Sequence, residues 1–139
     1  MTDARSSSDP ERTDGEPVAT RIDRIAREAS RARESFEAPA DPDERSREYL
    51  ESGLWPVIEC YIDVVRAGDR LDPDRHNALE EALNTWLALY ARCYGVETDP
   101  DFSVREAAEL FVDTHNIRDT AQLLTRVPDP AAARRADRE

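Results

Sequence analysis

The chain has 139 residues, a length that favours a single domain, and its 31 acidic and 19 basic residues give a formal net charge of −12. No apolar run approaches the ~18 residues needed to cross a bilayer, the N-terminal stretch lacks the apolar segment of a signal peptide, and two cysteines do not indicate a disulfide framework. We therefore expect a soluble, cytoplasmic protein with no membrane partner.

The charged residues are unusual in kind as well as in number, because all 19 basic residues are arginine. Surplus carboxylates keep a protein soluble but repel one another in the compact state. This repulsion fades in strong salt, where the Debye length falls to roughly 3 Å at 1 M. The composition resembles that of proteins from halophilic archaea, which keep molar salt in their cytoplasm. An acidic protein from a GC-rich genome is the alternative interpretation.

The first 37 residues divide into two parts. Residues 1–19 contain almost no apolar side chains, so we expect them to be disordered. Residues 20–37 predict an amphipathic helix with a narrow apolar stripe. The stripe consists of Ile22, Ile25, Ala29, Ala32 and Phe36. It can dock on the remainder of the chain or pair with another chain as a short coiled coil. Ile22, Ile25, Ala29 and Phe36 are therefore candidate partner-contact residues.

Residues 43–127 are predicted to form a helical bundle domain, whose first part is interrupted by Gly53 and Pro56. A proline inside a helix removes one backbone hydrogen bond and clashes with the preceding turn. We expect either a short helix near 43–52 and a second helix from Trp55, or one kinked helix. In the second piece, apolar residues surround a narrow charged stripe, which predicts a position at the centre of the core. These residues are Leu54, Trp55, Val57, Ile58, Tyr61, Ile62, Val64 and Val65.

The strongest helical pattern covers residues 73–94. Asp72 can cap its start, Pro73 suits the first helical position, and Gly95 can end it. One apolar face runs along the whole segment and is expected to face the helix at 55–67. This face consists of Leu79, Ala82, Leu83, Trp86, Leu87, Tyr90 and Tyr94.

Residues 103–127 predict two short helices joined by a polar hinge at 114–116, and the first helix begins with the capping box Ser103 and Glu106. The net charge of this region is −1, against −9 for residues 38–102. Weakly charged faces are the ones that a partner can cover. The last residues, 128–139, are expected to be a disordered tail.

The segment SVREAAELF resembles the first helix of many helix-turn-helix DNA-binding proteins, in which an alanine pair faces the second helix. The resemblance implies a transcriptional regulator. Arg118 and Gln122 would then contact bases, since arginine suits guanine and glutamine suits adenine. Arg105 and Arg126 would add contacts to DNA.

Three departures from the helix-turn-helix pattern weaken this resemblance. The hinge lacks the glycine often found in such turns, and Val112 stands where a small residue is expected. Asp113 and Asp119 would face phosphates, and no basic surround supplies the attraction that DNA binding requires. A structural helical hairpin that completes the bundle is the preferred interpretation.

Catalysis and metal binding are not indicated. The only soft ligand types are Cys60, Cys93, His76 and His115. In an antiparallel hairpin of residues 55–67 and 73–94, the two thiols would lie ~20 Å apart along the axis. They could share neither a metal nor a disulfide. The four glycines stand alone, so no phosphate-binding loop is present. We expect buried, inert cysteines, no cofactor and no enzymatic activity.

These patterns predict an all-α fold, a small bundle of four to five helices with an N-terminal amphipathic helix and disordered ends. The predicted function is that of a non-enzymatic adaptor or regulatory protein. It would act through protein–protein contacts, self-association included, in a high-salt cytoplasm. A helix-turn-helix regulator at 103–127 is the alternative.

Overall fold

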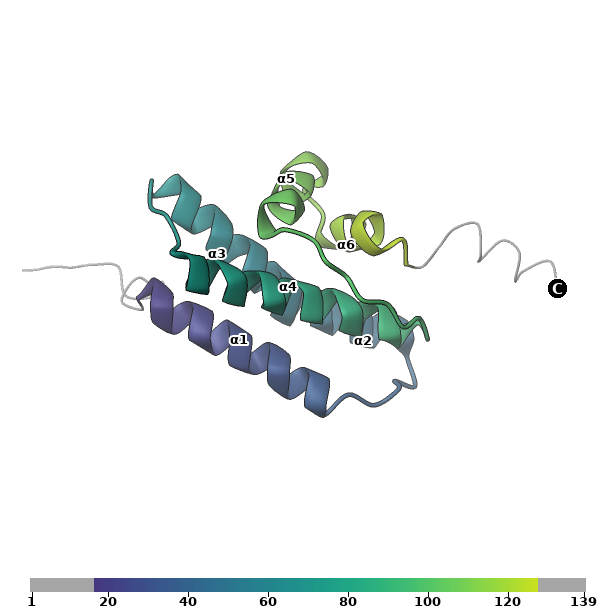
Figure 1. Ribbon diagram of the computed structural model, residues 1–139. Helices are drawn as coiled ribbons and strands as arrows, with labels where there is room; N and C mark the ends of the chain where they lie inside the picture. The colour runs from purple at the N-terminus through teal and green to yellow at the C-terminus, as the bar shows by residue number, and fades with distance from the viewer. Residues whose placement is uncertain (1–16, 128–139) are drawn as a thin grey trace, which may run out of the picture.

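The computed structural model describes residues 17–127, which form six α-helical segments and one π-helical segment, with no strand among them (Figure 1). In chain order they are α1 (Val18–Glu34), α2 (Pro42–Tyr49), η2 (Leu50–Leu54), α3 (Trp55–Arg66), α4 (Pro73–Cys93), α5 (Val104–Thr114) and α6 (Ile117–Thr125). Because α2, η2 and α3 continue without a break, they make one bent helix. The predicted all-α bundle is confirmed. Helix α1 begins two residues before the expected start, and residues 1–16 and 128–139, where we predict disorder, lie outside the described residues.

Helix α4 is the central element of the bundle. It lies between α1 on one side and the α5–α6 hairpin on the other, with the bent helix alongside it (Figure 1). Its start follows the sequence pattern, since the Asp72 side chain accepts a hydrogen bond from the backbone N–H of Arg75. The buried residues of α4 are Leu79, Ala82, Leu83, Trp86, Leu87, Leu89, Tyr90, Ala91 and Cys93. The expectation that the helix at 55–67 occupies the centre of the core is correct for only one of its faces, because Val57, Ile58, Cys60 and Val64 are buried but Val65 is 54% exposed.

The bend between α2 and α3 occurs where the sequence places Gly53 and Pro56, and it takes the form of one kinked helix. The π turn lies directly before Pro56, whose ring cannot fit against the carbonyl four residues back. The widened turn brings the backbone of Gly53 against Trp86. A Cβ at position 53 would lie 2.3 Å from Trp86 Cδ2. Glycine therefore permits the contact that joins the bent helix to α4.

Helix α1 packs along α4, and its apolar stripe is buried within the chain. Ile22, Ile25 and Ala29 are each no more than 2% exposed. Phe36, just beyond the helix, packs against Tyr49 and lies under the guanidinium of Arg92, 4.2 Å from its ring centroid. Helix α1 is thus an integral part of the bundle. The alternative, in which this stripe docks on another chain, is not what the structure shows.

Candidate functional site

The hairpin formed by α5 and α6 turns within two residues. His115 adopts the left-handed conformation, with φ of 54°, where many helix ends have glycine. Asn116 then begins α6, and its side chain accepts a hydrogen bond from the backbone N–H of Asp119 at 2.9 Å. Histidine and asparagine are among the residues that occupy such backbone positions without glycine. The predicted hinge is therefore present, although its sequence lacks the usual glycine.

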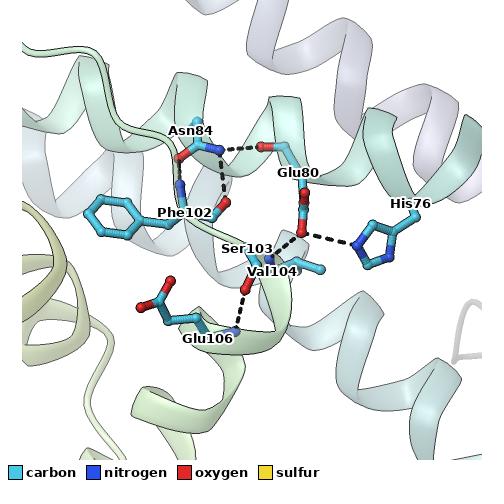
Figure 2. Close-up of polar contacts among 7 residues, drawn as sticks. All are labelled: His76, Glu80, Asn84, Phe102, Ser103, Val104 and Glu106. Atoms are coloured by element: carbon cyan, nitrogen blue, oxygen red, sulfur yellow. Dashed lines mark hydrogen bonds and ion pairs between the residues drawn. The ribbon is translucent and has the colours of Figure 1, made fainter. Parts of the chain in front are cut away.

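Side chains of α4 hold the segment that leads into α5 (Figure 2). Asn84 Nδ2 donates to the carbonyl oxygen of Phe102 at 3.0 Å, and Asn84 Oδ1 accepts from the N–H of Phe102 at 2.9 Å. The Asn84 amide thereby provides hydrogen-bond partners for both the N–H and the C=O of Phe102, a residue outside regular secondary structure. Such groups are costly to leave unpaired when they are partly buried. Asn84 therefore sets the position of α5 relative to α4.

The start of α5 is capped by two side chains, only one of which the sequence pattern predicts (Figure 2). Ser103 Oγ accepts from the N–H of Glu106 at 3.0 Å, as expected for a capping box. Glu80 of α4 supplies the second acceptor, because its Oε2 accepts from the N–H of Val104 at 3.0 Å. The same oxygen lies 3.0 Å from His76 Nε2. A carboxylate at a helix N-terminus is stabilising, so Glu80 connects α5 to α4.

Arg118, the first candidate DNA-contact residue, has partners within the chain. Its Nη2 donates to Tyr94 Oη at 3.2 Å and lies 3.6 Å from Asp43 Oδ1. Tyr94 in turn donates to Asp43 Oδ1 at 2.8 Å, and its oxygen lies 3.0 Å from Oγ of the buried Ser46. This cluster joins α6 to α2 and to the end of α4. The guanidinium is thus engaged in holding the hairpin on the bundle.

Of the other three candidate DNA-contact residues, Gln122 and Arg126 follow Arg118 in and directly after α6, and Arg105 lies on α5. Arg105 is paired with Glu109 through Nε and Oε2 at 3.1 Å, and both side chains are exposed. Gln122 is half-buried, and Arg126 is exposed in a left-handed position directly after α6. Two of the three arginines therefore have carboxylates as neighbours. This arrangement leaves little positive charge for the phosphate contacts on which DNA affinity depends.

The two cysteines are buried and unpaired with each other. Burial raises the pKa of the Cys93 thiol to about 11 and also raises the pKa of Cys60. Since the thiolate is the reactive form, these thiols are weak nucleophiles at neutral pH. No group of three or more His, Cys, Asp or Glu side chains within residues 17–127 could hold a metal ion.

A groove with apolar side chains in its lining lies between α3 and α5. It has a volume of about 590 Å³. It is lined by Tyr61, Ile62, Val65 and Arg66 of α3 and by Arg105, Ala108, Glu109, Val112 and Asp113 of α5. Val65 and Val112 are each 54% exposed. A recess of about 250 Å³ adjoins it, where the rings of Trp55 and Phe111 lie 4.8 Å apart.

The groove exists because α3 has more apolar positions than the bundle covers. Val57, Ile58 and Val64 are buried against the core, whereas Tyr61 and Ile62 are half-buried and Val65 is exposed. The helical pattern predicts that all of these residues lie in the core, and this prediction is wrong for Val65. Two signals could have found the groove: the apolar surplus of α3, and the large apolar Val112 at a position where the helix-turn-helix pattern has a small residue.

None of the helices in residues 17–127 combines the length and the apolar character that a membrane crossing requires. No curated protein and no solved structure matches the chain. One family model matches residues 16–129, a range that includes every helix from α1 to α6. The chain belongs to this family, which is described as a domain of unknown function (DUF8055).

Proposed function

We propose that this chain is a non-enzymatic adaptor or regulatory protein that acts through protein–protein contacts, and that the α3–α5 groove is its contact surface. The observation that carries the proposal is the pair of valines at the groove, each about half exposed. Only four large apolar residues in residues 17–127 are exposed, and two of them, Val65 and Val112, line this groove. Apolar patches with polar rims are typical of interaction sites.

The charges of the groove also support a protein contact. Its lining contains two arginines and two carboxylates, Arg66, Arg105, Glu109 and Asp113, so its formal charge is zero. The whole chain, in contrast, carries −12. Charged groups are costly to desolvate without a partner, and equal numbers of both signs allow each of these groups to be paired when the groove is covered. This groove is therefore a surface that another protein can cover at low electrostatic cost.

We infer further that the protein works in a cytoplasm that contains molar salt. The support is its composition, with 31 acidic residues and arginine as the sole basic residue type. Screening at molar salt weakens the repulsion between carboxylates on one chain and between two acidic proteins. The helical circular dichroism signal and the melting temperature should both rise between dilute and molar KCl. A flat response would contradict the high-salt inference.

Site-specific photo-crosslinking tests the contact surface. A photoreactive amino acid is placed at Val112 in the groove or, as the matched control, at Leu123 on α6, which is 58% exposed outside it. Both proteins are irradiated in a lysate of the source cells at molar KCl. We expect a discrete protein adduct from position 112 and none from position 123. Equal labelling at both positions, or no adduct at 112, would contradict the assignment of the groove.

A further inference from the structure

We propose that the α3–α5 groove binds the same groove of a second copy of this chain, which gives a two-fold symmetric dimer. This inference rests on the proposed function, because it names the partner of the same surface. In a two-fold interface each partner contributes the same patch, so every contact between two different residues occurs twice. The groove must therefore be complementary to itself in shape and in charge.

The shape of the groove meets this requirement. Val65 and Val112 stand exposed on α3 and α5, and the small side chain of Ala108 also lines the groove. When two such surfaces face each other, the valines of one copy can enter the groove of the other. Both copies then remove apolar side chains from water, which is the main driving force for association.

The charges of the groove favour a second copy over a partner of opposite charge. Arg105 is paired with Glu109 in the same helix. This leaves Arg66 and Asp113, and neither has an ion pair with another of residues 17–127. A two-fold axis can place Arg66 of each copy beside Asp113 of the other. Two equivalent ion pairs then form across the interface. The neutral lining offers no attraction to a basic partner, and molar salt screens the repulsion between the acidic surfaces of two copies.

The size of the surface sets the expected strength of the dimer. The groove and its adjoining recess are lined by fewer residues than the roughly 20–30 per side of a standard interface. We therefore expect a dimer that dissociates on dilution. In sedimentation equilibrium at a salt concentration where the protein is folded, the mass should rise from 15.8 kDa towards twice that value with increasing concentration.

Variants in the groove test whether this surface forms the dimer. Val65→Asp and Val112→Asp should each raise the dissociation constant at least about tenfold, since each would desolvate an unpaired carboxylate at the interface. Leu123→Asp is the matched control, because it introduces the same charge at an equally exposed apolar residue outside the groove, and it should leave the dimer unchanged. Circular dichroism verifies that each variant is folded.

A charge exchange tests the two-fold pairing itself. Arg66→Asp alone and Asp113→Arg alone would each place like charges at both symmetry-related contacts, so each variant should dimerise less than the wild type. A mixture of the two variants places opposite charges at both contacts. The mixed dimer should therefore form in preference to either variant on its own. The measurement is made at the lowest KCl concentration at which the proteins fold, because salt screens these contacts.

Three results would overturn the proposal: a monomer at every concentration, a dimer disrupted by Leu123→Asp but not by the groove variants, or no recovery in the mixture. Its failure can be distinguished from failure of the proposed function. A monomeric chain that still forms an adduct with a different protein from position 112 would retain the contact surface and eliminate only the second copy as its partner. A dimer in which position 112 does not crosslink would contradict both.

Discussion

Helices α1 and α3 both have apolar faces, but the bundle buries that of α1 and leaves part of that of α3 exposed. The stripe of α1 is narrow and partly alanine, and yet Ile22 and Ile25 are almost completely buried against α4. Helix α3 is apolar around most of its circumference, and yet Val65 is 54% exposed. The helix that the sequence suggests as a docking element is covered, and the helix that it places at the core centre is partly open.

The difference arises from what packs against each helix. Helix α1 lies along α4, which is the longest helix, and Arg21 of α1 is 3.1 Å from Asp63 of α3. Helix α3 is covered on one side by the core, but α5 meets it at an angle (Figure 1). A groove lies beside their contact. An apolar stripe thus indicates that a surface favours burial, and the arrangement of the neighbours decides whether the same chain buries it.

The largest effect should come from Trp86→Ala, at the contact between α4 and the bent helix. Trp86 is 6% exposed, packs on Gly53 and lies 5.6 Å from the Tyr49 ring. Removal of such an aromatic side chain typically costs ~3–5 kcal/mol of unfolding free energy. Chemical denaturation at constant salt measures this cost. A melting temperature within a degree or two of wild type would show that α4 is not the centre of the core.

A matched pair of truncations compares α1 with α3 directly. Ile25→Ala should reduce the free energy of unfolding by about 2–5 kcal/mol, because the side chain is buried. Val65→Ala should change it by no more than about 0.5 kcal/mol, as is usual for exposed positions. Both are measured by denaturation at low protein concentration, where a dimer would not contribute. Similar costs for the two variants would remove the contrast between the helices.

Asn84→Ala should have an intermediate effect at the opening of α5. The two hydrogen bonds to the backbone of Phe102 would be lost, and unpaired partly buried groups cost about 1–3 kcal/mol. Hydrogen exchange of the α5 amides should increase more than that of α1. Asn84→Asp is an informative comparison, since it keeps the acceptor for the Phe102 N–H but puts a charged oxygen in place of the donor to the Phe102 and Glu80 carbonyls. Unchanged exchange in α5 would mean that packing alone holds this helix.

Tyr90→Phe should destabilise the end of the hairpin by about 1 kcal/mol, because the Tyr90 hydroxyl donates to the carbonyl of Val127. Burial raises the pKa of Tyr90 from 10.0 to about 12, so the folded state holds this proton more tightly than the unfolded state. The wild type should therefore lose stability as the pH rises from 10 towards 12. Tyr90→Phe should not show the part of this stability loss that comes from Tyr90. If the stability of both proteins depended on pH in the same way, the raised pKa of Tyr90 would be contradicted.

Among the polar contacts, the smallest effect is expected for Arg118→Ala on α6. Its contacts with Tyr94 and Asp43 are partly exposed, and ion pairs of this kind contribute about 0–1 kcal/mol. The variant should also leave any interaction with DNA unchanged in a mobility-shift assay at the folding salt. Sequence-specific retardation of a DNA fragment by the wild type, abolished in a folded Arg118→Ala protein, would instead support the helix-turn-helix interpretation.

Features that depend on neighbouring residues could be predicted from the sequence alone. The all-α class follows from helical periodicity, and the starts of α4 and α5 follow from Asp72 and Ser103, which cap backbone groups three residues away. The bend follows from Gly53 and Pro56. In each case the interaction lies within one or two turns of chain, so the order of the residues is enough to determine it.

Only the tertiary structure decided which surfaces are covered and which side chains meet. Glu80 caps α5 and Arg118 reaches Tyr94, each across 24 positions of sequence, and no local pattern indicates either contact. The apolar surplus of α3 is visible in the sequence, but which of its residues line the α3–α5 groove is not, since the adjacent valines Val64 and Val65 are buried and exposed respectively. The helical spacing of apolar residues shows only that one face of a helix is apolar. Whether it becomes core or binding surface depends on the fit between segments that are distant in the chain.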